Sequence, residues 1–400
     1  MKSLNLELFY ADIAVTDDTA GRSAIAPEVL VSLWLLATLD SISSARELGR
    51  RCETDMPYLW LCGTVRVNYH TLSDFRVQHG ARLERLLIDT LAALLDQGLV
   101  PPQTVAQDGM HVKASAGSSS FRRRPTLKKL PQDAQTHVER LKQEAEDEPE
   151  RLTGAARRTA AAERAAREKL ERIEEALRQH EKLSQQREQR KKGDGEKTRV
   201  STTDPDARKM KMANGGYNVQ FMTDADTRLI VGVEVTKEGT DGAELPPMLE
   251  KVQENYGKTP DTALVDSAYA TKEGVTLAEI AGAKVISNVP RSEQLEQPGK
   301  NPHERQKGDT DEYANFRARM AEPENQQRYK LRPSVAEFPN ADCRNRNLRQ
   351  FRVRGLMKVK AVALWYVLAF NLMRLINWEF FGNLKNLSAA ERVELAAPPR

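Results

Sequence analysis

Three acidic residues in separate segments have the surroundings that a phosphoryl-transfer site requires. Asp108 lies in the middle of TVAQDGMHVKASA, Asp266 ends the apolar run TALV, and small residues follow both. Glu337 opens a predicted helix in YKLRPSVAEF. Carboxylates that lie close together repel one another and favour Mg²⁺, a hard cation that binds oxygen ligands and substrate phosphates. Two such ions roughly 3.5–4 Å apart could activate a water or hydroxyl and stabilise a leaving oxygen.

An isolated acidic residue is more often a solvated turn residue or half of an ion pair. Asp108 and Asp266 differ from that case because an apolar run precedes each of them, as expected where a strand leaves the core. Glu337 alone would be a weak candidate. Its segment also supplies hydroxyl and cationic groups that could bind phosphates, and these are Tyr329, Arg332 and Arg344. The hypothesis of a metal site therefore depends on all three acids together.

The predicted order of elements would bring these acids together. From residue 104 the patterns indicate a strand with Asp108, a hairpin, a helix, a strand ending at Asp266, a helix, a strand and closing helices. That is the order of a ribonuclease H-like fold, a mixed α+β or α/β architecture whose sheet is flanked by helices. In this topology the first and fourth strands are neighbours at the sheet centre. A late helix carrying Glu337 would pack over them.

The chain divides into four predicted parts. Residues 1–100 have helical periodicity and form a candidate DNA-binding domain, although a bundle that only packs against its neighbour stays an alternative. Residues 101–117 and 200–378 form the catalytic domain. Residues 118–199 are a charged helical insertion, expected to fold as an antiparallel hairpin that serves as an arm or as a solvated spacer. Residues 379–400 form a C-terminal tail.

Basic residues are clustered although the formal net charge is only +4. The clusters are RRRPTLKK, RQRKK and RNRNLRQFRVR. Local patches of this kind favour binding to a polyanionic partner even though the total charge of the protein is small. Five basic residues are candidate phosphate contacts: Lys128, Lys129, Arg349, Arg352 and Arg354. The alternative is that they lie on solvated helix faces and contact no DNA.

Other classes of function find little support in the sequence. The three cysteines and six histidines lack zinc or CxxC spacing, and the glycine-rich ANGGYN lacks the pattern of an ATP-binding loop. The apolar runs 29–39 and 361–373 are expected to be buried helices too short to span a bilayer. We therefore expect a cytoplasmic protein with no membrane partner. The four tryptophans are expected in the core, and these are Trp34, Trp60, Trp365 and Trp378.

Several short motifs occur together in an order that is specific to one family. They are NYHTLSDFR, VAQDGMHVKASA, STTDPDARKM with GYNVQ, ALVDSAYAT, and the long segment that begins RYKLRPSVAEF. On these motifs the chain resembles bacterial insertion-sequence transposases of the DDE class, most closely the eleven-eighty-two group. The resemblance covers roughly residues 20–378.

This resemblance implies roles for individual residues. The metal-binding and catalytic triad would be Asp108, Asp266 and Glu337. The tyrosine–arginine–glutamate–lysine signature of the family would correspond to Tyr329, Arg332, Glu337 and Arg344. Two departures stand out: an arginine replaces the usual lysine at 344, which retains the positive charge, and the interval from Arg332 to Glu337 is one residue longer than usual.

The resemblance also implies a reaction. A DNA transposase would hydrolyse DNA at the ends of the insertion sequence and then use the exposed 3′-hydroxyl to attack target DNA. It would require two Mg²⁺ ions, for which Mn²⁺ could substitute. Its partners would be the terminal inverted repeats and the target DNA, bound by a homodimer that pairs the two ends. The alternatives are a metal-dependent nuclease of the same fold and a catalytically silent DNA-binding remnant.

Overall fold

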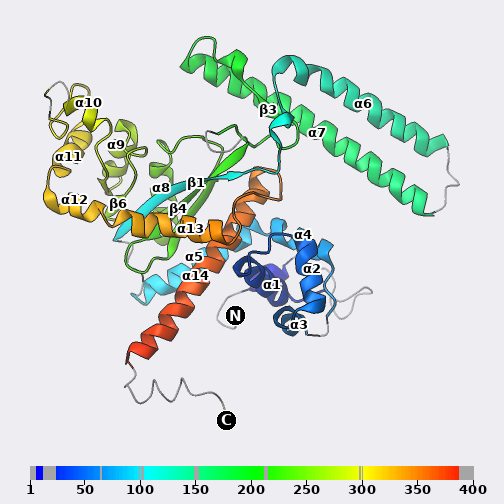
Figure 1. The fold of residues 1–400 in the computed structure, drawn as a ribbon, viewed down its shortest axis with the longest axis horizontal. Coiled ribbons are helices and arrows are strands. Elements are labelled where there is room, and N and C mark those ends of the chain that lie inside the picture. The colour runs from blue at the N-terminus through cyan, green and yellow to red at the C-terminus, as the bar shows by residue number, and fades with distance from the viewer. Residues whose placement is uncertain are drawn as a thin grey trace.

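The computed structural model describes most of the chain and places it in three parts, a helical N-terminal unit, a mixed sheet with helices around it, and a long helical hairpin (Figure 1). The described residues are 6–11, 24–63, 65–98, 100, 103–147, 153–210, 215–296, 299 and 301–386, and side chains are not described for 144–157 and 378–386.

The N-terminal unit is helical, as its apolar periodicity predicts. Its elements are η1 (Glu7–Tyr10), α1 (Pro27–Leu39), α2 (Ala45–Thr54), α3 (Met56–Cys62), α4 (Tyr69–Gln78) and α5 (Gly80–Asp96). The buried Trp34 joins α1 to α4 because its indole N–H donates to the carbonyl of Leu72 at 3.0 Å. The prediction that Trp60 is buried was wrong, since its side chain is 81% exposed. It lies on the short α3, which buries Tyr58 and Cys62 instead.

Five strands form one mixed sheet in the order β5-β4-β1-β6-β7. The strands are β1 (Thr104–Lys113), β4 (Gly216–Asp224), β5 (Ile230–Thr236), β6 (Thr262–Leu264) and β7 (Lys284–Ile286). β1 is antiparallel to β4 and parallel to β6, so it lies at the centre with a partner on each side. This order and these directions confirm the predicted ribonuclease H-like fold.

Helices cover the sheet and connect it to the N-terminal unit. They are α8 (Leu245–Tyr256), α9 (Lys272–Ile280), α10 (Ser292–Glu296), α11 (Asp311–Arg319), α12 (Pro323–Tyr329), the π-helical turn η4 (Pro333–Glu337), α13 (Phe338–Asn345) and α14 (Leu356–Asn386). α14 packs against α1, α4, α5 and β5. Its Asn371 side chain both donates to and accepts from the backbone of Ile230 at 2.9 Å, which caps the outer edge of the sheet.

The long α14 differs from the prediction of a short buried helix. Residues 356–377 are long and apolar enough to cross a membrane, because the helix continues on both sides of the apolar run 361–373. Two thirds of its most apolar window is buried inside the protein. Trp365 in this window donates its indole N–H to the carbonyl of Arg76 at 3.0 Å. In this structure the apolar surface of the helix is therefore largely used for packing.

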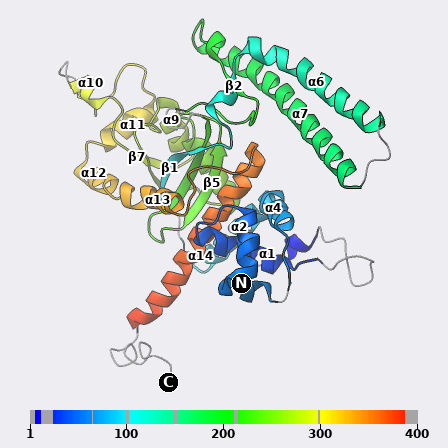
Figure 2. The same ribbon diagram turned by 45° about the vertical axis from the view of Figure 1, so that its right-hand side comes forward.

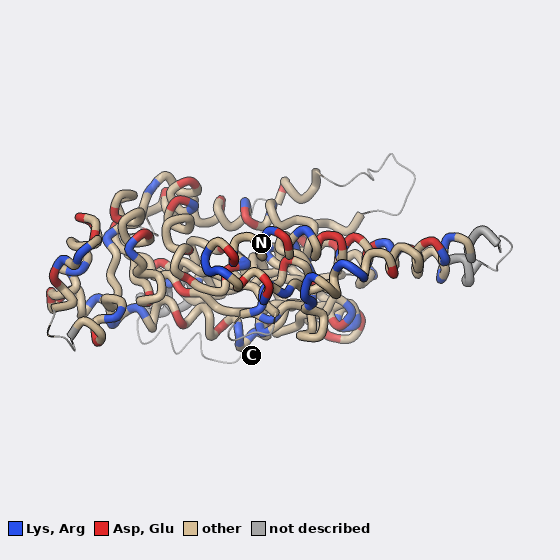
Figure 3. The backbone as a smooth tube through the Cα atoms, turned by 90° about the horizontal axis from the view of Figure 1, so that it is seen from above, with Lys and Arg blue, Asp and Glu red and all other residues tan. Residues whose placement is uncertain are grey.

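The insertion after β1 forms an antiparallel helical hairpin, which projects from the rest of the molecule in both ribbon views (Figures 1 and 2). Its elements are η2 (Ser118–Ser120), β2 (Phe121–Arg122), α6 (Arg124–Asp147), α7 (Thr153–Arg190), η3 (Gly195–Lys197) and β3 (Val200–Ser201). α6 begins at Arg124, so the basic residues Lys128 and Lys129 lie in its first two turns. Acidic and basic residues alternate along the projecting arm (Figure 3), which is typical of a solvated helix pair.

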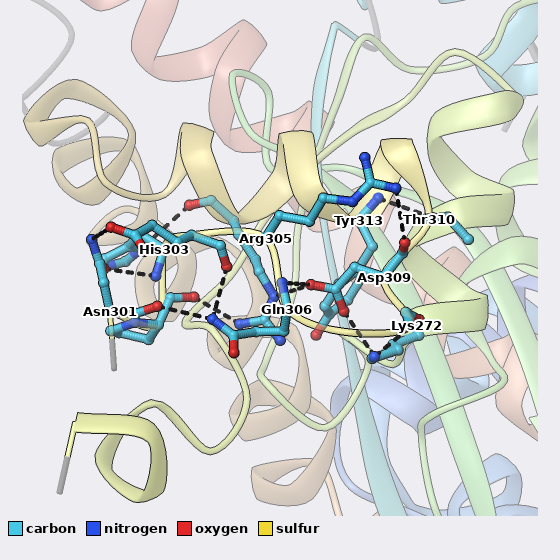
Figure 4. Close-up of polar contacts among 12 residues, drawn as sticks. Lys272, Asn301, His303, Arg305, Gln306, Asp309, Thr310 and Tyr313 are labelled. Atoms are coloured by element: carbon cyan, nitrogen blue, oxygen red, sulfur yellow. Dashed lines mark hydrogen bonds and ion pairs between the residues drawn. The ribbon is translucent and has the colours of Figure 1, made fainter. Parts of the chain in front are cut away.

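An ion-pair network centred on one buried carboxylate holds the segment between β7 and α12 (Figure 4). The side chain of Asp309 is fully buried and contacts Lys272 Nζ and Arg317 Nε, both at 2.8 Å. The ring of Tyr313 lies beside both cations, 6.0 Å from Lys272 Nζ and 4.9 Å from the Arg317 guanidinium carbon. Because a buried carboxylate needs such partners, this network fixes the start of α9 to the segment that leads into α12.

Candidate functional site

The fold brings the three predicted acids to one place. The parallel register of β1 and β6 pairs Ala106 with Leu264. Asp108 and Asp266 each lie two residues further along the chain, and the same Arg332 nitrogen approaches an oxygen of both. Glu337 is the last residue of η4, which packs against β1 and β4. The acids therefore come from a central strand, the end of its neighbour and a covering helix.

A single arginine lies between the three carboxylates. Arg332 places Nη2 3.2 Å from an Asp108 oxygen and 3.8 Å from an Asp266 oxygen, and Nη1 3.4 Å from a Glu337 oxygen. Its side chain is only 8% exposed. A planar guanidinium with several N–H groups suits this arrangement, whereas a lysine ammonium could not reach three separated acids. The structure thus brings Arg332, predicted from sequence as a DNA contact, together with the acids.

The extra residue between Arg332 and Glu337 is accommodated by a π-helical turn. Residues 333–337 have i→i+5 spacing between two α-helical stretches, and a single inserted residue commonly produces such a bulge in a helix. In an α-helix a separation of five residues would rotate Glu337 away from Arg332. In the π turn the two side chains remain in contact. Despite the longer spacing, Arg332 Nη1 therefore remains 3.4 Å from a Glu337 oxygen.

Asp108 lies at the bottom of the site. Burial raises its pKa to about 6, although Arg332, the backbone N–H of Gly109 and the side chain of Asn340 all act in the opposite direction. Asn340 Nδ2 donates to Asp108 Oδ2 at 2.9 Å. The sequence analysis missed Asn340. Its position three residues after Glu337, on the same helix face, is the signal that could have identified it.

The raised pKa of Asp108 predicts a pH-dependent stability for the metal-free protein. The folded protein holds the proton up to a pH of about 6, while the unfolded chain releases it near 3.8. The contribution of the protonated Asp108 carboxyl to the stability of the folded protein is therefore lost as the pH rises from 3.8 to about 6. We expect Asp108→Asn, which cannot ionise, to be more stable than the original protein at pH 8 and to lose this advantage near pH 4.

Chemical denaturation of both proteins in a chelator at several pH values checks this prediction. A difference in unfolding free energy that stays constant from pH 4 to pH 8 would contradict it.

The other two acids are open to solvent. The side chains of Asp266 and Glu337 are 48% and 58% exposed. Asp266 Oδ1 accepts from the Ser267 hydroxyl at 3.0 Å and from the Ala268 N–H at 3.2 Å. Tyr329 is half-buried at the end of α12, and burial raises the pKa of its hydroxyl, with Asp266 and Glu337 acting in the same direction. The site is thus closed below Asp108 and open beside the other acids.

The remaining predicted DNA contacts lie outside this group. Arg344 is exposed on α13, two helical turns after Glu337. The loop after α13 runs along the end of β1, since Lys113 forms a parallel bridge with Gln350. That loop carries three exposed arginines: Arg349, Arg352 and Arg354. Two exposed lysines lie further away, on α6 of the insertion: Lys128 and Lys129.

The acids provide hard oxygen donors of the type that divalent cations bind. Within the described part of the chain, no three Asp, Glu, His or Cys side chains are grouped closely enough to hold a metal ion. The guanidinium of Arg332 lies between the acids and supplies their counter-charge. Carboxylate oxygens are the donor type that a divalent cation prefers, but in this structure Asp108, Asp266 and Glu337 are joined by Arg332 and are not grouped as metal ligands.

Comparisons with known families agree with this geometry. Residues 2–78 match the profile described as Transposase domain (DUF772), and residues 194–372 match the profile described as Transposase DDE domain. The second match includes Asp266 and Glu337, whereas Asp108 lies before it and reaches the site through the pairing of β1. No curated protein and no solved structure matches the chain significantly. The two profiles together cover more than half of the chain. The chain belongs to the insertion-sequence transposases of the DDE class and is a polynucleotidyl transferase.

Proposed function

We propose that this transposase hydrolyses DNA at the ends of its insertion sequence and transfers the exposed 3′-hydroxyl to target DNA, with Mg²⁺ as the cofactor. The observation that carries the proposal is the convergence of Asp108, Asp266 and Glu337 on one cationic group, Arg332. A place where three acids surround a positive charge suits a metal that binds phosphate oxygens.

Each residue has a separate task in this proposal. Asp108, Asp266 and Glu337 hold Mg²⁺, which when bound helps to activate the attacking oxygen and stabilises the leaving one. Asn340 orients Asp108 through its hydrogen bond to Oδ2. Arg332, once the metal neutralises the acids, is free to bind a phosphate oxygen of the DNA.

DNA binding is proposed to involve the N-terminal unit as well as the catalytic domain. Arg46, Arg50 and Arg66 line a pocket between α2 and α4. Arg50 and Arg66 pair with acids, whereas the guanidinium of Arg46 lies 5.3 Å from the ring of Tyr69. The loop after α13 touches the start of α2, because Arg352 Nε donates to the Ser43 hydroxyl at 2.9 Å. We propose that the exposed arginines of these two neighbouring parts both contribute to the DNA-binding surface.

The assembly and the location of the reaction are also part of the proposal. A homodimer would hold two terminal inverted repeats in one complex, and the reaction would take place on DNA in the cytoplasm. We also propose that three parts of the chain have different roles, and these parts are residues 1–100, residues 101–117 with 200–378, and the insertion 118–199. DNA binding, chemistry and a clamp or spacer are assigned to these parts in turn.

The test is a cleavage assay on the DNA that flanks the gene. Duplexes that carry the paired inverted repeats are incubated with the purified protein in Mg²⁺, in Mn²⁺ or in a chelator. We expect metal-dependent nicks that leave 3′-hydroxyls, followed by joined products when target DNA is added. Cleavage without joining would favour a nuclease of the same fold. Specific binding without cleavage in either metal would favour a silent DNA-binding protein.

The loop after α13 allows a prediction about salt dependence. Arg349 and Arg354 are exposed, and their Nε–H groups donate only to the carbonyls of Arg344 and Ser115. If both contact phosphates, the double substitution Arg349→Ala/Arg354→Ala should weaken binding to all DNA sequences alike. It should also reduce the slope of log affinity against log salt concentration by about two.

Fluorescence anisotropy over a range of salt concentrations measures this slope. Arg85→Ala is the matched control, because it removes an exposed arginine that already pairs with Asp89 at 2.8 Å. A slope unchanged by the double substitution would exclude this loop from the DNA interface.

A further inference from the structure

A buried hydrogen-bond network lies behind Asp108, on the opposite face of the sheet. Asp241 Oδ1 accepts from Asn218 Nδ2 and from Gln220 Nε2, both at 2.7 Å. Gln220 Oε1 in turn accepts from the Tyr269 hydroxyl at 2.6 Å and from Gln107 Nε2 at 3.0 Å. Apart from the half-buried Asp241, these side chains are buried. Five polar groups from four segments thus form one connected unit.

The network contacts β1, which carries Asp108, and the turn that directly follows Asp266. Gln107 and Gly109 flank Asp108 in β1, and their side-chain positions face away from it because successive residues alternate across a strand. Tyr269 follows Asp266 by three residues, in the turn after β6. The hydrogen bonds to Gln220 therefore tie β1 and this turn to the same residue of β4.

Gly109 shows how closely the network approaches the catalytic strand. A Cβ atom at this position would lie 2.3 Å from Gln220 Nε2 and 2.7 Å from Asp241 Oδ1. Any side chain would therefore displace the amide and the carboxylate. Glycine is the residue that permits such an approach between a strand and another group. The residue next to Asp108 thus has a structural reason to lack a side chain.

Asp241 determines the direction of every hydrogen bond in the network. An ionised carboxylate can only accept, so the amide of Gln220 must turn its Nε2 towards Asp241. Its oxygen then faces Tyr269 and Gln107, and the Tyr269 hydroxyl must donate. One orientation of Gln220 satisfies all of its own contacts, whereas Gln107 Oε1 and Asn218 Oδ1 in the same network have no hydrogen-bond partner among the described residues.

We propose that Asp241, Gln220 and Tyr269 are positioning residues for DNA cleavage, which hold β1 and the turn after β6 so that Asp108 and Asp266 keep their separation. The proposal rests on the function proposed above. None of the three side chains hydrogen-bonds to the site acids or to Arg332 among the described contacts. They act through the backbone segments that carry the acids. A misplacement of about 1 Å in such a site can reduce the rate about a hundredfold.

A reciprocal exchange of amide and carboxylate tests this role. Gln220→Glu replaces the amide with a second carboxylate facing Asp241, and we expect it to reduce the cleavage rate about a hundredfold. Adding Asp241→Asn restores a donor opposite the new acceptor, with the same total charge as in the original protein. The Asn218 amide, whose Oδ1 has no hydrogen-bond partner among the described residues, can turn to accept from the same nitrogen of the introduced asparagine. We expect the double variant to recover a rate within about threefold of the original.

Tyr269→Phe is the milder variant, which removes only the hydroxyl. We expect its turnover rate to fall about tenfold at saturating DNA, with little change in the DNA concentration required for half-maximal rate. Thermal unfolding of each variant identifies any loss of fold. A Tyr269→Phe protein that is folded and fully active would overturn the proposal, as would a double variant that is folded and no better than Gln220→Glu alone.

Binding of Mn²⁺, followed by electron paramagnetic resonance, gives a readout independent of activity. We expect Gln220→Glu to weaken Mn²⁺ binding about tenfold and the double variant to restore it, since correct spacing of the acids determines affinity. If the original protein binds Mn²⁺ but does not cleave its own ends, the proposed function fails while this comparison still tests the network. Equal Mn²⁺ affinities in all variants would overturn the positioning role.

Discussion

Replacing Asp108 with Asn is expected to reduce metal-dependent DNA cleavage by at least about a thousandfold while the protein remains folded. One preorganised donor already accounts for about a hundred- to thousandfold in rate in sites of this type, and a lost carboxylate ligand to the metal should cost at least as much. The fold should tolerate the change because an amide oxygen can still accept from Asn340, which donates to Asp108 at 2.9 Å.

Single-turnover cleavage of labelled end DNA measures the effect, with circular dichroism to confirm folding. Asp261→Asn is the matched control, since Asp261 is an exposed acid at the other end of β6, just before the strand begins. We expect this control to cleave at the original rate. An Asp108→Asn protein that still cleaves in Mg²⁺ would show that the metal site lies elsewhere.

Replacing Arg332 with Ala is expected to have two large and separable effects. In the metal-free protein three carboxylates lose their shared counter-charge, and removal of one partner of a buried ion pair costs roughly 3 kcal/mol of stability. The proton that Asp108 can take up at lower pH limits this loss. In the active protein the loss of a phosphate-binding and positioning group should reduce cleavage about a hundredfold.

Added Mg²⁺ should reveal the competition between the metal and Arg332. In the original protein the cation must replace a guanidinium that already contacts all three acids. In Arg332→Ala that competitor is missing, so the unfolding midpoint should rise more on addition of Mg²⁺. Differential scanning fluorimetry with and without the metal measures the two shifts. Equal shifts in both proteins would show that Arg332 does not occupy the place of the cation.

Two further variants sharpen the comparison. Arg332→Lys keeps the positive charge but cannot contact three acids at once, so we expect an intermediate Mg²⁺ response. Lys330→Ala removes a charge from the same segment, at a residue with no described ion pair to the acids, and should respond like the original protein.

The sequence by itself identified the candidate acids, predicted the order of the strands and indicated a helical insertion after the first strand. Asp108 and Asp266 follow apolar runs, and the alternation in the 216–236 hairpin identifies two strands, because strand burial is a local property of the chain. The right strand order then follows from a small set of allowed topologies. Local pattern failed where burial depends on a neighbour, as with Trp60, which is 81% exposed.

Only the tertiary structure decided how the site is held. Arg332 contacts Asp108 across 224 residues of sequence and Tyr269 contacts Gln220 across 49, and no periodicity relates such pairs. The sequence showed that the spacing from Arg332 to Glu337 is one residue longer than usual. Whether the two side chains still meet depended on the π turn that accommodates the extra residue. Side-chain partners that come from different elements are chosen by packing in three dimensions, and that choice placed one guanidinium among three acids.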